Sequence, residues 1–201
     1  MGMYLELIPL SNENISKVLQ DPPLVWKVVA PDDPEPYETA RKEASSAGFF
    51  SKLFGGRRPP DPALTLSDGE GDSASLSLDK AWHGIHYMLT RSAWEGEEPL
   101  NFLVSGGKEV GDLEVGYGPA RVFTPDQVQR IHSALRPLDE AFLRGRFNPT
   151  EMMKLEIYPE IWDRDPSDDD TFGYCMENFT GLKDFIETAA GRKIGLLVCI
   201  L

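Results

Sequence analysis

The strongest constraint on the fold is an apolar run near the C-terminal end of the sequence, residues 194–201. Apart from one glycine it contains only hydrophobic residues, and a continuous apolar run of this length is typical of a strand buried on both faces. Such a strand needs a covering layer on each side, and helix and strand signals are intermixed along the rest of the chain. The 201 residues are enough for one sizeable core. We therefore predict a single α/β domain over 1–201, in three layers, with a mixed β-sheet flanked by helices.

Local signals predict several other elements. Thr124-Pro125-Asp126-Gln127 combines an N-cap threonine, a proline at the first helical position and a glutamine that can complete a capping box. Elsewhere the pattern indicates strands over 3–9 and 155–159, extended chain over 115–123, and two helical stretches, at about 169–178 and 180–190.

Residues 30–71 differ in character from the rest of the chain. They are rich in proline and end in an Asp/Gly/Ser cluster, which predicts an irregular, partly mobile insertion with one short helix near 37–46. Within it, residues 48–58 combine Phe49, Phe50 and Phe54 with three cations. These aromatic residues either fasten the long loop onto the domain or form an amphipathic anchor.

The formal net charge of −13 excludes nucleic acid as a partner class, because phosphate binding needs a basic surface. An acidic surface can instead attract a basic protein partner by long-range steering. No run approaches 18 apolar residues, so we expect no membrane span. The first six residues lack the features of a signal peptide, and Cys175 and Cys199 form no C-x-x-C pair. We therefore predict a cytoplasmic protein, and nothing in the sequence indicates its oligomeric state.

Two of the three histidines lie in the segment Leu78–Thr90, which reads as one amphipathic helix. Its spacing predicts an apolar stripe of Trp82, Ile85, His86 and Leu89 beside a polar stripe of Asp79, His83 and Tyr87. In the polar stripe Asp79 can orient the imidazole of His83, as in a general base. The alternative is that His86 is a core histidine bonded to backbone and that His83 pairs with Asp79 near the helix start.

The turn at 116–121 is the second candidate. Tyr117 offers a hydroxyl, and Arg121 can grip a carboxylate or phosphate. A pocket between this turn and the 79–90 helix would be completed by Tyr87, Glu156 and Tyr158. The alternative is a structural turn that joins two extended segments, because no G-x-G-x-x-G or Walker pattern is present.

We expect neither a metal nor a cofactor. His83 and His86 could supply two ligands, but zinc needs a third protein ligand. Glu156, Asp112 or His132 could provide it only by coincidence of folding. The sequence contains no H-E-x-x-H, EF-hand or G-x-S-x-G pattern and no cysteine cluster.

Taken together, these motifs resemble those of a known family. The segment Leu78–Thr90 is similar to the signature helix of the YfbM-like family, small bacterial domains of unknown function. Later motifs follow in the same order: Tyr117–Arg121, the Thr124-Pro125 helix start, Glu156–Pro159 followed by Trp162, and the helix Asn178–Ala190 before the final strand. The resemblance covers 1–10 and roughly 76–201. It implies a three-layer α/β domain with a mixed sheet, and it implies no accepted activity or cofactor.

Two functions of different classes follow as hypotheses. The first is a non-enzymatic, cytosolic protein-interaction module, of an immunity-type or regulatory kind, that binds a basic protein. The second is a small-ligand-binding protein or enzyme with His83 as base, Asp79 orienting it and Arg121 binding an anion. The second requires an open cleft at these residues, and it fails if His83 and His86 are both buried with backbone partners. A third possibility is that the histidine-rich segment is only the centre of the core.

Overall fold

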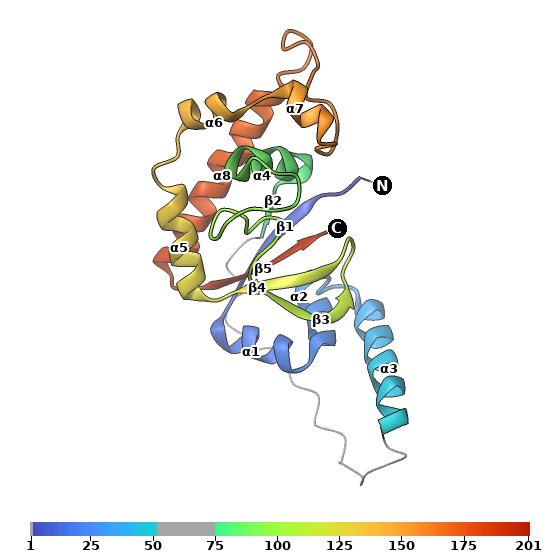
Figure 1. Ribbon diagram of the computed structural model, residues 1–201. Helices are drawn as coiled ribbons and strands as arrows, with labels where there is room; N and C mark the ends of the chain where they lie inside the picture. The colour runs from blue at the N-terminus through green and yellow to red at the C-terminus, as the bar shows by residue number, and fades with distance from the viewer. Residues whose placement is uncertain (1, 52–74) are drawn as a thin grey trace.

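A computed structural model describes residues 2–51 and 75–201, without the side chains of residues 45–51. In these ranges the chain forms one five-stranded sheet, in the order β2-β1-β5-β4-β3 (Figure 1). The strands are β1 (Leu5–Leu10), β2 (Leu76–Ser77), β3 (Lys108–Glu114), β4 (Pro119–Phe123) and β5 (Gly195–Ile200).

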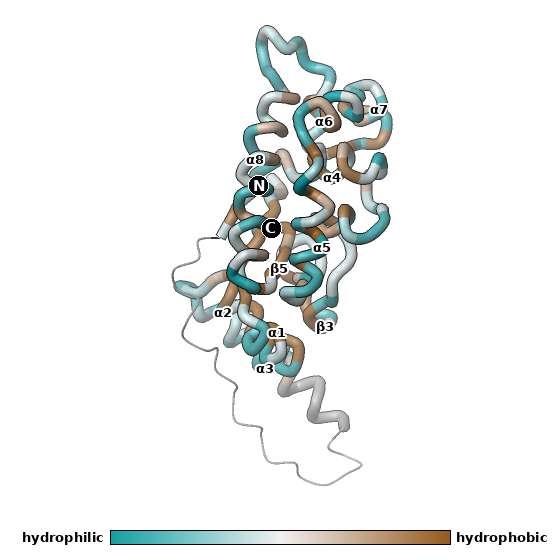
Figure 2. The backbone as a smooth tube through the Cα atoms, turned by 90° about the vertical axis from the view of Figure 1, so that its left-hand side faces the viewer, coloured by the Kyte–Doolittle hydropathy of each residue, from teal (hydrophilic) through white to brown (hydrophobic). Residues whose placement is uncertain are grey.

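Strand β5 lies in the middle of the sheet and confirms the prediction of burial on both faces. Leu196 and Val198 belong to the hydrophobic core on one face, and Leu197 and Cys199 belong to the core on the other. On one side β5 pairs with β1 along the whole length of both strands, and on the other it pairs with β4. Figure 2 shows hydrophobic segments gathered around β5.

The helices form the two outer layers, which confirms the α/β class. One face of the sheet is covered by α1 (Asn12–Gln20), a 3-10 turn (Pro22–Leu24), α2 (Val25–Val29) and α3 (Pro34–Ser51). The other is covered by a 3-10 turn (Asp79–Ala81), α4 (Trp82–Thr90), α5 (Pro125–Leu135), α6 (Glu140–Arg146), α7 (Pro149–Lys154) and α8 (Thr171–Gly191).

The mixed sheet, in contrast, was a wrong prediction. Every strand pairing among the described residues is antiparallel. Intermixed helices and strands suggested parallel crossovers, but the four helices between β4 and β5 return the chain beside β4 in the opposite direction. An antiparallel strand between two helical layers is as fully buried as a parallel one, so its apolar sequence does not distinguish the two.

Some of the predicted elements are confirmed by the structure, and others differ from the prediction. The capping box at Thr124 is confirmed, because Gln127 N–H donates to Thr124 Oγ1 and Thr124 N–H donates to Gln127 Oε1. The two helical stretches after residue 169 are one helix, α8. The strand predicted over 155–159 is instead a turn. Strand β3 was not predicted, because its sequence is mostly polar and contains Gly111.

Residues 34–51 of the predicted irregular insertion form helix α3, which includes the short helix predicted at 37–46. The prolines there do not make the segment irregular. Pro34 and Pro36 lie in the first turn of α3, where a missing N–H leaves no helical hydrogen bond unmade. Asp33 Oδ1 accepts a hydrogen bond from Glu35 N–H and helps to start the helix. Residues 52–71 of the insertion, and the side chains of Phe49 and Phe50, lie outside the described residues.

Candidate functional site

Helix α4 carries the predicted histidines and is buried on every side. All residues from Trp82 to Leu89 are buried, including His83 and His86, so there is no solvent-facing polar stripe. Gly84 lies where α4 meets Trp162 and Cys175, and a Cβ there would overlap the Trp162 ring. A helix that is covered all round belongs to the core.

Both histidines are bonded to backbone groups. His83 Nε2 lies 2.7 Å from Ala93 O, and its Nδ1 accepts from Tyr158 N–H at 3.0 Å. His86 Nε2 lies 3.1 Å from Glu95 O, and its Nδ1 has no hydrogen-bond partner in the described part of the chain. Because a carbonyl can only accept, each ring carries a proton on Nε2. His83 is neutral, because its Nδ1 accepts a hydrogen bond and so carries no proton.

Burial also keeps these rings uncharged. It lowers the pKa of His83 to about 4, and burial together with the nearby His83 lowers the pKa of His86 to about 4. With both nitrogens engaged, His83 has no free position at which to take a proton from a substrate. Both histidines are therefore buried and bonded to backbone groups, as in the alternative that places the histidine-rich segment in the core.

The predicted Asp79–His83 pair does not form. Asp79 lies in the 3-10 turn before α4, so the helical i, i+4 spacing does not extend to it. Its carboxylate instead accepts a hydrogen bond from the Tyr174 hydroxyl at 2.8 Å.

Tyr87 connects α4 to α7. Its hydroxyl donates to Glu151 Oε2 at 2.7 Å, and Glu151 also forms an ion pair with Arg91, whose guanidinium lies 4.9 Å from the Tyr87 ring centre. Burial and the bond to Glu151 raise the pKa of the Tyr87 hydroxyl. Tyr87 is thus a buried structural contact.

Arg121 is a buried clamp on a loop. Its guanidinium donates to the carbonyls of Phe102, Leu103 and Ser105 at 2.7–3.0 Å. The side chain is 7% exposed, and burial lowers its pKa to about 10, so the group stays charged at neutral pH. An anionic ligand would have to displace these carbonyls.

The remaining predicted residues lie in separate surroundings. Tyr117 is 58% exposed on the turn between β3 and β4, where its N–H donates to Ile200 O. Glu156 is exposed in the turn after α7 and has a φ of 52°. Tyr158 is half-buried, with its ring 6.2 Å from that of Trp82. The predicted pocket between α4 and the 116–121 turn is therefore not assembled from these side chains.

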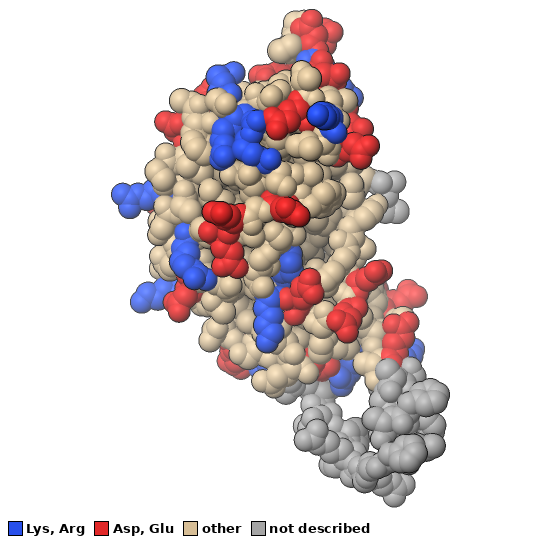
Figure 3. All heavy atoms as spheres, in the orientation of Figure 1, with Lys and Arg blue, Asp and Glu red and all other residues tan. Residues whose placement is uncertain are grey.

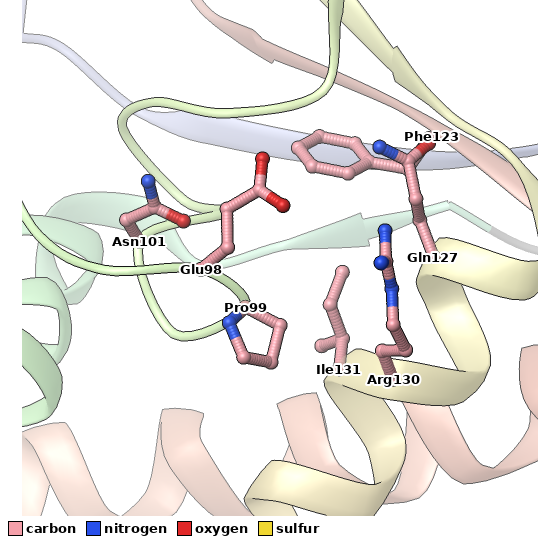
Figure 4. Close-up of a pocket in the computed structure, with 7 residues that line it drawn as sticks. All are labelled: Glu98, Pro99, Asn101, Phe123, Gln127, Arg130 and Ile131. Atoms are coloured by element: carbon pink, nitrogen blue, oxygen red, sulfur yellow. The ribbon is translucent and has the colours of Figure 1, made fainter.

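A small pocket lies instead between α5 and the connection from α4 to β3 (Figure 4). It is lined by Glu98, Pro99, Asn101, Phe123, Gln127, Arg130 and Ile131. Its space of about 10 Å³ suits a single water molecule and is too small for a substrate.

A larger groove of about 320 Å³ runs between α2, α3 and β3. Apolar contact surface comes from Trp26, Pro36, Ala40 and Leu113, and four carboxylates line it: Asp33, Glu35, Glu43 and Glu114. In the part of the chain that the structure describes, no lysine or arginine lines it. Figure 3 shows acidic side chains gathered over the region of β3 and α3. The groove was not predicted from the sequence, because only a short helix near 37–46 was expected on one wall and strand β3 was not expected on the other.

Among residues 2–51 and 75–201, no group of three or more His, Cys, Asp or Glu side chains is placed to hold a metal ion. Across the same ranges, no helix has the length and hydropathy needed to cross a membrane.

Comparison with known proteins supports the fold. The crystal structure of YfbM from Escherichia coli, a protein of unknown function, matches with a TM-score of 0.63 at 17% sequence identity, covering 100% of both chains. No curated protein sequence matches the chain. A family model described as "Domain of unknown function (DUF1877)" matches residues 1–199. With this match over nearly its whole length, the chain belongs to the DUF1877, or YfbM-like, family.

Proposed function

We propose that this protein is a non-enzymatic interaction module that binds a basic segment of a partner protein in the groove between α3 and β3. The observation that carries the proposal is the lining of that groove, where four carboxylates surround apolar side chains and no lysine or arginine is among the described lining residues. A role of the regulatory or immunity type, in which the partner is neutralised, is consistent with such binding.

The chemistry of the groove favours lysine and arginine. Their long aliphatic stems can lie on Trp26 and Leu113 while their charged ends reach the carboxylates on the two walls. The net charge of −13 would also steer a basic partner towards the protein. Catalysis has no comparable support, because the histidines and Arg121 are occupied by internal hydrogen bonds.

The test is selection of binders from a random peptide library displayed on phage, followed by titration of the enriched peptides. We expect lysine and arginine to be enriched and the affinity to fall with added salt. The variant Glu35→Lys/Glu114→Lys reverses one charge on each wall. It should weaken binding about tenfold or more, because like charges then face the peptide.

The matched control is Glu177→Lys/Glu187→Lys, which makes the same change in net charge at two exposed positions of α8. This control should lose much less affinity than the groove variant. Equal losses in the two variants would show that only net charge matters. Selected peptides without basic residues would contradict the proposal directly.

A further inference from the structure

The connection from α4 to β3, residues 91–107, is held in place by buried side chains. The carbonyls of Ala93 and Glu95 are bonded to His83 and His86. Farther along, Arg121 binds three carbonyls between residues 102 and 105. The two histidines of the signature helix thus fasten the backbone on either side of one residue, Trp94.

Trp94 is the large side chain that this support leaves in solvent. Its indole is 53% exposed, and its ring centre lies 4.5 Å from that of His83. His83 in turn stacks on Trp82, with ring centres 4.6 Å apart and an interplanar angle of 7°. Trp94 therefore rests on a rigid aromatic base, and little side-chain freedom is left to lose on binding.

The surroundings of Trp94 in the chain are acidic. Glu95 and Glu97 are both exposed, and Arg91 is the only cation in residues 91–107. Arg91 is directed to Glu151 and to the Tyr87 ring. An exposed indole with exposed carboxylate residues next to it in the chain attracts a cation by cation–π and Coulomb interactions together.

We propose that Trp94, with Glu95 and Glu97, is a recognition site for an arginine side chain of a protein partner. A guanidinium is planar and weakly hydrated, so it stacks on an indole better than an ammonium does. A pre-organised tryptophan is also a frequent centre of protein interfaces. This site lies in the connection that follows α4 and contacts that helix through His83. It shares no residue with the groove between α3 and β3, so the inference goes beyond the proposed function.

The test follows the indole N–H resonances of the four tryptophans by NMR, with Trp94 assigned from the Trp94→Phe variant. The probe is the peptide acetyl-Gly-Arg-Gly-Arg-Gly-amide, compared with the same peptide carrying citrulline, the uncharged isostere, in place of arginine. We expect the Trp94 resonance to shift saturably with the arginine peptide. The affinity for the citrulline peptide should be lower by about tenfold or more.

Two variants locate the effect. Glu95→Gln/Glu97→Gln should weaken binding of the arginine peptide severalfold, whereas Tyr117→Ala, which removes another exposed aromatic side chain, should leave it unchanged. Equal shifts with the citrulline peptide, equal binding of tetramethylammonium, or no Trp94 shift at the highest peptide concentration would each overturn the inference. The groove variant Glu35→Lys/Glu114→Lys should keep the Trp94 response, so failure of one site does not imply failure of the other.

Discussion

Helix α4 with its attached loop and the groove between α3 and β3 use polar residues in opposite ways. In the first region His83, His86 and Arg121 bind backbone carbonyls within the chain. In the second region the carboxylates line the groove on the surface, and the described lining residues include no cation. The histidine-rich segment is the most conspicuous candidate site in the sequence, yet its histidines stabilise the fold. A cluster of chemically versatile residues therefore indicates a site only if their hydrogen bonds are not already made inside the chain.

This difference predicts unequal sensitivity to perturbation. Changes at α4 and its loop expose or orphan buried polar groups, which costs several kcal/mol. Changes in the groove alter exposed charges, which contribute little to folding.

Acidification should give the largest effect. The unfolded histidines take up a proton near the ordinary pKa of 6.5, whereas folded His83 and His86 do so only near 4. The unfolded state therefore binds more protons between these values, and stability is lost as the pH falls from 6.5 towards 4. At pH 5 the loss should be about 2 kcal/mol per histidine relative to pH 7. Urea unfolding at the two pH values measures it, and NMR titration of either imidazole near 6.5 would contradict it.

The next largest effect should come from Arg121→Met. The substitution removes the donor for four loop carbonyls, two of them in buried bonds, so we expect the free energy of unfolding to fall by about 3 kcal/mol. Arg164→Met is the control, because Arg164 is half-exposed and forms an exposed ion pair with Asp169. It should change stability by less than about 0.5 kcal/mol. If urea unfolding gave similar losses of free energy of unfolding for the two variants, the hydrogen bonds of Arg121 to the loop would not stabilise the fold as expected.

Gly84→Ala tests the packing of α4 against its neighbours. The added methyl group would overlap Trp162 and crowd Cys175, so we expect a loss of about 2 kcal/mol despite the better helix propensity of alanine. Gly181→Ala in α8 is the matched control, because nothing lies within 4 Å of a Cβ there. It should stabilise the protein by up to about 1 kcal/mol. The measurement is the melting temperature, which should fall for Gly84→Ala and rise for Gly181→Ala. A higher melting temperature for Gly84→Ala would contradict the expected overlap with Trp162.

The smallest effect on stability should come from the groove. Glu35→Lys/Glu114→Lys changes two exposed side chains, so we expect the free energy of unfolding to stay within about 0.5 kcal/mol of the original value. The same urea experiment measures it. A loss as large as that of Arg121→Met would mean that the groove, like α4, serves the fold.

Features that depend on residues close together in the sequence were predicted correctly, and features that depend on distant segments were not. The Thr124 capping box and the burial of β5 were predicted because each depends on a few adjacent residues. The direction of strand pairing was not, because it depends on how four helices return the chain. The candidate site was predicted least well. Trp94 and Trp26 were missed, although the acidic run Glu95-Gly96-Glu97-Glu98 after Trp94 was a visible signal.

The sequence by itself determined the family, the α/β class, the buried central strand and the acidic charge. Only the tertiary structure decided that neutral His83 and His86, and the guanidinium of Arg121, form hydrogen bonds with backbone carbonyls of the loop between α4 and β3. It also decided that the proline-rich start of α3 forms the wall of a groove. The physical reason is that propensity, capping and composition are local, whereas the burial and hydrogen-bond partners of a side chain are set by distant segments. For His83 these include Tyr158, which lies 75 residues away in the chain.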